Sequence, residues 1–177
     1  VYGEGLIEYT RGTDTFFYVG RAIPERLSAI GKSLVAAFGI RRKFFHFEFF
    51  VQGGDYIPIE INSRPPGGAI LDMMNFSVDG DLYRAWADMV ADRTAELPAA
   101  KKYVIGYVGR KEKPYTFSHE EILARFGHRL VEFAENPPVF SGIMGRHRYI
   151  FRSENEAEIR GIADAAAQET GYSITDH

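Results

Sequence analysis

Apolar and polar positions alternate along this chain with two different periods, which predict strands in some segments and helices in others. A period of two residues marks the strand segments TFFYV, YVIGYVG, HRLVEFAE and HRYIFRS, and two further strands over residues 43–51 and 56–62. A helical period follows Pro24, Ala69, Leu82, Ser118 and Ser153. The mixture predicts an α+β fold, an antiparallel β-sheet with helices packed on one face.

Capping residues set the expected ends of two of these helices. Ser118 with Glu121, and Ser153 with Glu156, have the spacing of capping boxes. In such a box the serine hydroxyl and the glutamate carboxylate each accept a hydrogen bond from a backbone N–H of the first turn. The last helix is expected to run from Ser153 to a glycine cap at Gly171.

The strands over 43–51 and 56–62 carry charged residues among apolar ones. Side chains of a strand point alternately to its two faces, so His46 and Glu48 share one face of the first strand. By the same alternation Glu60 shares a face of the second strand with Pro58 and Asn62. The remaining faces are expected to belong to a core; they carry Phe45, Phe47, Phe49 and Val51 in the first strand and Ile57, Ile59 and Ile61 in the second.

The loop between these strands decides which residues oppose each other. A two-residue turn over 53–54 would pair Glu48 with Ile59 and so mix the polar and the apolar faces. A three-residue loop over 53–55 pairs Glu48 with Glu60 instead. We therefore predict the odd-length loop, with a glycine in the left-handed conformation. The same register places His46 opposite Asn62.

Two opposed glutamates point to a bound cation. Opposed residues have Cβ atoms about 5 Å apart, and carboxylates at that distance repel each other. Carboxylate and amide oxygens without a histidine or cysteine cluster suit Mg²⁺ or Mn²⁺, so Glu48, Glu60 and Asn62 are the predicted metal ligands. One alternation step further, Arg64 offers a guanidinium fork for phosphate or carboxylate. The arrangement is typical of a nucleotide–phosphate site.

Composition narrows the classes of function. The 177 residues are 45% hydrophobic, which suffices for a folded core, and the net charge of −3 gives no sign of a nucleic-acid surface. The absence of cysteine excludes disulfides and thiolate chemistry and favours the cytoplasm. No apolar run has the length of a membrane span. We expect a cytoplasmic protein with small-molecule partners, no nucleic acid and no membrane; a homodimer is compatible with the sequence.

The polar residues of the two strands, with the preceding segment IPERLSAIGKSLVAAFGI, resemble the metal-binding end of the ATP-grasp enzymes. The spacing from Glu48 to the E-x-N-x-R run is similar to the biotin carboxylase and carbamoyl-phosphate synthetase branch. RPPGG and DLYRAWADM look more like the ATP-grasp amino-acid ligases. The resemblance implies that 1–95 is the C-terminal half of an ATP-grasp domain and 100–177 a small β-rich C-terminal segment with a terminal helix. The family's N-terminal domain and lid have no counterpart, so we expect a fragment that is inactive alone.

The resemblance implies a role for each polar residue. Glu48 would bind one Mg²⁺, Glu60 would bind two, and Asn62 would bind the second ion and a phosphate oxygen. Arg64 would bind the nucleotide and act catalytically, stabilising the phosphoryl group in transfer or the acyl phosphate that forms. Weaker candidates for contact with the substrate are His46, Gly67 and Gly68.

The reaction that the resemblance implies uses ATP with Mg²⁺ or Mn²⁺ to activate a carboxylate as an acyl phosphate, which an amine then captures. Such phosphoryl transfer depends on positioning and charge neutralisation and needs no protein nucleophile. The partners would be small-molecule carboxylate and amine substrates. A bicarbonate-using carboxylase or a carbamoyl-phosphate synthetase-like enzyme is an alternative. A non-catalytic nucleotide-binding module is a further one.

Overall fold

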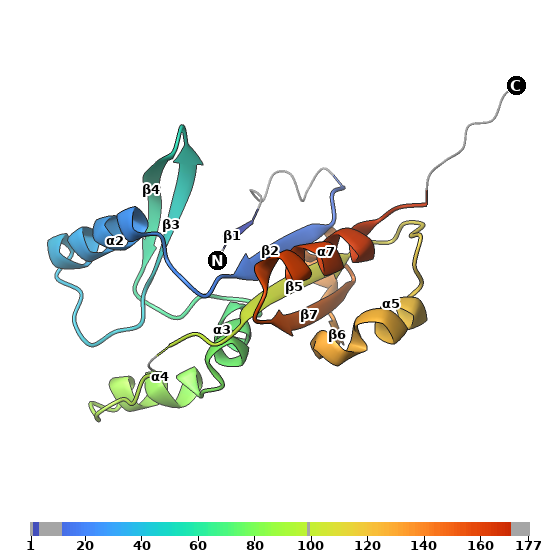
Figure 1. The fold of residues 1–177 in the computed structure, drawn as a ribbon. Helices are drawn as coiled ribbons and strands as arrows, with labels where there is room; N and C mark the ends of the chain where they lie inside the picture. The colour runs from blue at the N-terminus through green and yellow to red at the C-terminus, as the bar shows by residue number, and fades with distance from the viewer. Residues whose placement is uncertain (1, 4–11, 99, 171–177) are drawn as a thin grey trace, which may run out of the picture. The chain divides into compact units, whose positions relative to one another are not determined.

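The computed structural model describes residues 2–3, 12–98 and 100–170, in a mixture of helices and antiparallel strands (Figure 1). The strands are β1 Tyr2–Gly3, β2 Thr15–Val19, β3 His46–Gln52, β4 Asp55–Asn62, β5 Val104–Arg110, β6 Leu130–Glu135 and β7 His147–Ser153. The helices are α2 Glu25–Ala37, α3 Ile70–Val78, α4 Leu82–Val90, α5 His119–Phe126, α6 Ser141–Met144 and α7 Glu156–Ala167, with short 3₁₀ turns η1 Gly127–Arg129 and η2 Pro138–Phe140. No helix within the described ranges combines the length and the apolarity that crossing a membrane requires.

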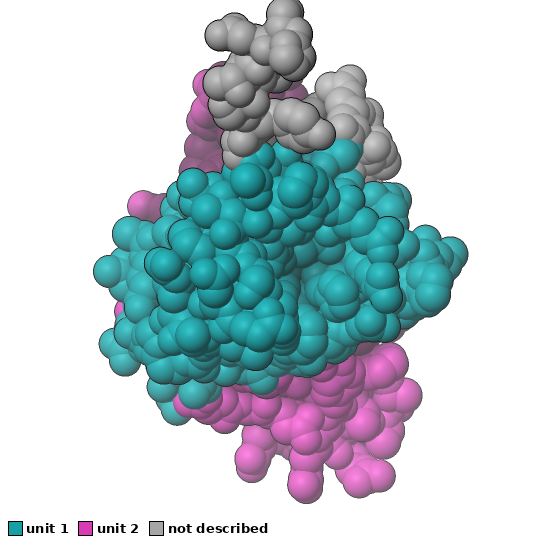
Figure 2. All heavy atoms as spheres, turned by 90° about the vertical axis from the view of Figure 1, so that its right-hand side faces the viewer, with its two compact units in different colours: residues 1–20, 102–177 teal, residues 21–101 magenta. Residues whose placement is uncertain are grey.

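The chain forms two compact units (Figure 2). Unit 2 comprises residues 21–101, and unit 1 comprises residues 1–20 and 102–177. The division into 1–95 as part of an ATP-grasp domain and 100–177 as a C-terminal segment stays a prediction. In the structure, the first twenty residues belong to the same compact unit as residues 102–177. The physical reason is strand pairing, because β2 pairs with β5 and places Phe17 opposite Tyr107.

Unit 1 contains a five-stranded antiparallel sheet in the order β1-β2-β5-β7-β6. All seven residues of β5 are buried, as expected for a strand in the middle of a covered sheet. Val108 and Phe151 on one sheet face form a single apolar cluster with Ile122 of α5 and Ile159 of α7. The predicted antiparallel sheet with helices on one face is thus confirmed for this unit.

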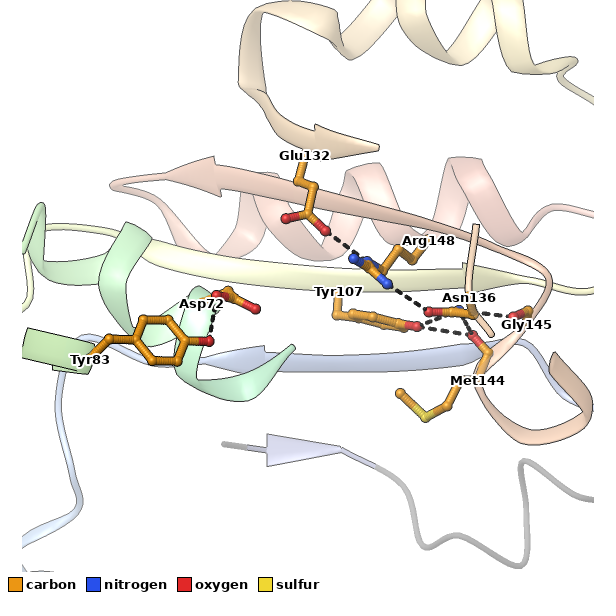
Figure 3. A network of polar contacts seen from close by, with 8 residues as sticks. All are labelled: Asp72, Tyr83, Tyr107, Glu132, Asn136, Met144, Gly145 and Arg148. Carbon is orange, nitrogen blue, oxygen red and sulfur yellow. Dashed lines mark hydrogen bonds and ion pairs between the residues drawn. The ribbon is translucent and has the colours of Figure 1, made fainter. Parts of the chain in front are cut away.

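A polar network on unit 1 holds the segment between β6 and β7 against β5 (Figure 3). The side-chain amide of Asn136 donates to the Tyr107 hydroxyl at 2.8 Å and to the Met144 carbonyl at 3.1 Å. The Tyr107 hydroxyl donates to the same Met144 carbonyl at 3.1 Å. Arg148 donates to the Asn136 side-chain oxygen at 3.2 Å. Burial raises the pKa of the Tyr107 hydroxyl, which therefore stays protonated as a donor.

Unit 2 contains α2, the β3–β4 hairpin, α3 and α4. The guanidinium of Arg26 in α2 pairs with Asp55 and donates to the Gly54 carbonyl at 3.3 Å, which ties this helix to the hairpin turn. No residue of α2 is buried. The Tyr83 hydroxyl of α4 donates to Asp72 of α3 at 2.8 Å (Figure 3). Polar contacts thus join α2 to the hairpin and α4 to α3.

The two predicted capping boxes have different outcomes. Ser118 and Glu121 form the expected box at the start of α5. The helix α7 is instead capped by Asn155, which accepts from the Ala157 N–H at 2.9 Å. Ser153 lies two residues earlier and accepts from the Asn155 N–H at 3.0 Å. The prediction of Ser153 as the cap is therefore wrong, because asparagine is an equally good N-cap and lies nearer the helix. The helix ends at Ala167, and the expected cap at 171 lies outside the described residues.

We predict that Gly109→Ala will destabilise unit 1. A Cβ at Gly109 would overlap the Met144 carbonyl, a backbone group that no side-chain rotation can move away. We expect a loss of about 1–3 kcal/mol in the free energy of unfolding, measured by chemical denaturation. The matched control is Gly161→Ala in α7, where a Cβ meets nothing within 4 Å and should be neutral or stabilising. Equal effects of the two substitutions would contradict the close approach.

Candidate functional site

The turn between β3 and β4 differs from the predicted one. Gln52 pairs with Asp55, so the loop has two residues, Gly53 and Gly54. Both glycines have positive φ, 58° and 84°, which is typical of the two-residue turns that match the twist of a hairpin. The expected left-handed glycine is present, but the expected three-residue loop is wrong.

The two glutamates nevertheless lie opposite each other, because a β-bulge shifts the register. Phe49 pairs with Pro58, and the next pair along the ladder is Glu48 with Glu60, which leaves Ile59 as an extra residue on β4. A bulge places two residues of one strand opposite one residue of the other. Pro58 has no N–H to donate to a ladder, and prolines inside sheets are confined to edges and bulges. The bulge thus restores the pairing that the loop alone would have lost.

The bulge also redistributes the apolar residues of β4 between the two faces. Ile57 pairs with Phe50 and Ile61 pairs with Phe47, so these isoleucines lie on opposite faces. Pro58, opposite Phe49, does not share the face of Glu60. The prediction of a common face for the isoleucines, and of Pro58 beside the acid, is therefore wrong. It assumed an uninterrupted period of two.

One apolar face of β3 is as predicted. The rings of Phe45 and Phe47 lie 5.0 Å apart and those of Phe47 and Phe49 6.3 Å apart, and Tyr56 meets Phe49 edge-on at 6.4 Å. The expected core does not cover the hairpin, however, among the residues that the structure describes. Val51 is 69% exposed, and neither strand contains a buried residue.

The structure joins three of the predicted residues through their side chains. The Asn62 amide nitrogen donates to a carboxylate oxygen of Glu60 and lies 3.0 Å from the His46 Nε2. The His46 Nδ1 lies 3.2 Å from the Arg64 carbonyl oxygen. A carbonyl can only accept and an amide NH₂ can only donate, so these contacts fit a neutral histidine that carries its proton on Nδ1. His46 therefore positions Asn62, a role that follows from the register and that residue type alone did not indicate.

The carboxylate pair fits a divalent cation. Glu48 lies directly opposite Glu60 and has no hydrogen-bond or ion-pair partner among the described residues. Asn62 uses its NH₂ group in the contacts above, and its oxygen stays available as a ligand. No group of three or more histidine, aspartate and glutamate side chains is placed to bind a metal within the described ranges. Two carboxylates and an amide suit Mg²⁺ or Mn²⁺, which complete their coordination with water and phosphate oxygens.

The remaining predicted site residues, Arg64, Gly67 and Gly68, follow the end of β4 in the sequence. The Arg64 guanidinium is exposed and donates to the Pro65 carbonyl at 3.0 Å, and no contact within the described part of the chain joins it to either glutamate. Gly67 and Gly68 precede α3, whose N-cap residue is Ala69 and which has no side-chain cap. The first N–H groups of this helix are therefore not satisfied by a capping side chain and can face an anion.

Comparisons with protein-family models and with curated proteins find no match. Among solved structures, the chain is similar to phosphoribosylglycinamide synthetase from Anaerococcus prevotii, with a TM-score of 0.60 and 11% identity over 84% of this chain and 42% of that one. It is also similar to the phosphoribosylaminoimidazole carboxylase ATPase subunit from Aquifex aeolicus, with a TM-score of 0.56 and 16% identity over 85% of this chain and 47% of that one.

Both of these proteins are ATP-grasp enzymes, and this chain spans less than half the length of either. The likeness, at these identities, shows the fold alone. The chain has the fold of part of an ATP-grasp enzyme, and the predicted resemblance is confirmed at that level.

We predict that Glu48→Gln will stabilise the hairpin when no divalent cation is present. The substitution removes a repulsion between directly opposed like charges, which is typically worth about 0.2–1 kcal/mol. Hydrogen exchange of the β3 and β4 amides should therefore slow. In the control, Asp55→Asn removes a carboxylate from the same hairpin that attracts Arg26, and exchange should quicken slightly. Faster exchange in Glu48→Gln would show that the two glutamates do not repel each other.

Proposed function

We propose that this chain carries the metal-binding part of a Mg-ATP-dependent ligase, which activates a carboxylate as an acyl phosphate for capture by an amine. One observation supports the proposal above all others. Glu48 and Glu60 lie opposite each other, with Asn62 bonded beside them, on the hairpin of a fold shared with two ATP-grasp enzymes.

Each residue has a distinct task in this proposal. Glu48, Glu60 and Asn62 hold Mg²⁺ or Mn²⁺, which when bound neutralises charge on the phosphate oxygens of ATP. His46 fixes the orientation of the Asn62 amide through its ring. Arg64 binds a phosphate or acyl-phosphate oxygen through its guanidinium, for which its exposed side chain has to leave the Pro65 carbonyl. The uncapped start of α3, after Gly67 and Gly68, offers backbone N–H groups to the same anion.

The reaction balances without a protein nucleophile. A substrate carboxylate oxygen attacks the γ-phosphorus of ATP, the bond from that phosphorus to the bridging oxygen breaks, and ADP leaves with the electron pair. An amine then attacks the acyl carbon, and phosphate leaves as the new amide bond forms. The proton released by the amine passes to a base or to water. The residues of this chain contribute positioning and charge stabilisation, which are the main sources of catalysis in phosphoryl transfer.

A second candidate function is a carboxylase that activates bicarbonate as carboxyphosphate. It is favoured by the similarity to a protein named as a carboxylase ATPase subunit. The metal-binding residues would be the same, because both reactions start with attack of an oxyanion on ATP. The two candidates differ in which acid stimulates the formation of ADP.

We predict that the 177-residue chain binds Mn²⁺ at the hairpin. Paramagnetic broadening of NMR signals should be strongest for residues of β3 and β4 near Glu48 and Glu60, and Mg²⁺ should reverse it by competition. Glu60→Gln should weaken Mn²⁺ binding by more than about tenfold, since a ligand contributes at least as much as the outer-shell partners that orient ligands. Glu25→Gln, an exposed acid of α2 in the same unit, serves as the control and should bind like the parent. Equal broadening in Glu60→Gln and the parent would refute the ligand assignment.

We predict that a longer protein containing this chain forms ADP only when Mg²⁺ or Mn²⁺ is present, and that EDTA stops the reaction. The test measures ADP formation with a panel of amino acids, each with and without an amine acceptor, and with bicarbonate. Stimulation by an amino acid together with an amine supports the ligase, whereas stimulation by bicarbonate alone supports the carboxylase. Full activity in EDTA would exclude both.

A further inference from the structure

Unit 1 contains a cavity that none of the proposed ligase residues line. It has a volume of about 320 Å³ and lies between the end of β5, the loop from β5 to α5, the start of α5 and the start of β7. Figure 2 shows unit 1 from the side of this loop and of α5. The charged residues of its wall are mostly cationic, with Glu112 as the acid among Arg110, Lys111, Lys113 and Arg146.

Arg110 is the unusual member of this wall, because it is a buried cation. It is only 6% exposed, as the last residue of β5, opposite His147. Its guanidinium donates to the Phe117 carbonyl at 2.7 Å and lies 3.7 Å from the centre of the Tyr115 ring. No carboxylate pairs with it within the described part of the chain, and its Nε has no hydrogen-bond acceptor. A buried charge is costly unless it is paired.

Lys113 and Arg146, two other cations of the wall, already have carboxylate partners. Lys113 lies 2.6 Å from Glu169 and 3.5 Å from Asp14, and Arg146 lies 2.6 Å from Glu112. Asp14 accepts hydrogen bonds from the Tyr115 hydroxyl at 2.7 Å and the Lys111 N–H at 3.0 Å. Glu112 and Glu169 are therefore engaged, whereas the Asp14 Oδ2 lies 3.5 Å from Lys113 and accepts no hydrogen bond from the described residues. Within that part of the chain, no carboxylate forms an ion pair with Arg110.

The start of α5 does not supply the attraction for an anion. Its capping box already satisfies two of the N–H groups there: Ser118 accepts from the Glu121 N–H, and Glu121 accepts from the Ser118 N–H at 2.8 Å. Two glutamates in that turn, Glu120 and Glu121, also offset the partial positive charge at this end of the helix. An anion in the cavity would therefore be attracted by the Arg110 guanidinium and not by the start of α5.

Aromatic rings form much of the remaining wall. Tyr115, Phe117 and Tyr149 all line the cavity. The Tyr149 hydroxyl lies 2.9 Å from the His119 Nδ1, and burial raises the pKa of this hydroxyl, so it stays protonated. Flat apolar surfaces beside a guanidinium suit a ligand with a planar body and one anionic group.

We propose that this cavity binds a small organic oxyanion, a phosphate monoester or a carboxylate, with Arg110 as its counter-ion and the aromatic wall against its body. A guanidinium presents two parallel N–H groups to either kind of oxyanion, so the two share one recognition chemistry. The proposal is independent of the ligase function, because its residues all belong to unit 1.

The test is an NMR titration of the ¹⁵N-labelled 177-residue chain with three probes: phenyl phosphate, benzoate and inorganic phosphate. We expect saturable shifts of the amides of residues 111–119 with phenyl phosphate or benzoate, and weaker binding of inorganic phosphate, which has no planar body. The tighter of the two aromatic probes identifies the preferred anionic group. Binding of inorganic phosphate alone would mean an adventitious ion only, and the absence of saturable shifts with all three would overturn the proposal.

Substitutions locate the interaction. Arg110→Met keeps the length of the side chain and should weaken binding of the better probe at least about tenfold, while Arg110→Lys should restore part of it. Arg146→Gln removes a cation of the wall and frees Glu112, and should weaken binding about fivefold. Arg129→Gln is the matched control, because Arg129 also pairs with a glutamate, Glu158, but lies outside the cavity.

The amide spectrum of each variant shows whether it is folded. If Arg110→Met does not fold, the comparison of Arg146→Gln with Arg129→Gln decides the question. Unchanged affinity in a folded Arg110→Met variant, or equal affinities in Arg146→Gln and Arg129→Gln, would contradict the proposal.

Discussion

The opposition of Glu48 and Glu60 across the hairpin is the constraint on which the candidate site depends. Two carboxylates on facing strands repel each other, and the register that holds them there also places His46 opposite Asn62. Asn62 in turn bonds to Glu60, two residues earlier on the same strand. A one-residue change in that register would turn one acid to the other face and separate the donor set. The charge arrangement is unfavourable for the isolated hairpin and favourable around a divalent cation, which is why it indicates binding more strongly than either glutamate would alone.

The pairing of the two glutamates could be predicted from the alternation of side chains along the sequence. The turn and the bulge that produce this pairing could not. The opposed glutamates were predicted through a three-residue loop, whereas the structure combines a two-residue glycine turn with a bulge at Ile59. The two arrangements give the same pairing at Glu48, so the correct pairs followed from an incorrect turn. A period of two cannot reveal a bulge, and Pro58 was the one residue whose missing N–H could have suggested it.

The parts of the fold that were predicted depend on local signals, and those that were not depend on distant segments. The Ser118 capping box and the glycine turn involve neighbouring residues, and the structure contains both. The pairing of β2 with β5 brings together residues that are 86 to 94 positions apart in the sequence, from Val19 with Ile105 to Thr15 with Gly109. In the sequence, Arg110 is likewise only a cation at the end of a predicted strand, and nothing near it indicates burial. Its burial, with no carboxylate paired to it in the described part of the chain, becomes visible only in the fold, where the Phe117 carbonyl and the Tyr115 ring contact its guanidinium.

The bulge in β4 has a consequence beyond the placement of the acids. A hairpin of two strands has two open edges, and such edges can recruit strands of other molecules and start aggregation. The risk is greater here because Phe50 and Val51 are 60% and 69% exposed. Pro58 removes one backbone donor from β4, and the neighbouring bulge increases the local twist, so the strand is a poor template for further β-pairing. The interruption that sets the register therefore also gives an apolar hairpin some protection against self-association.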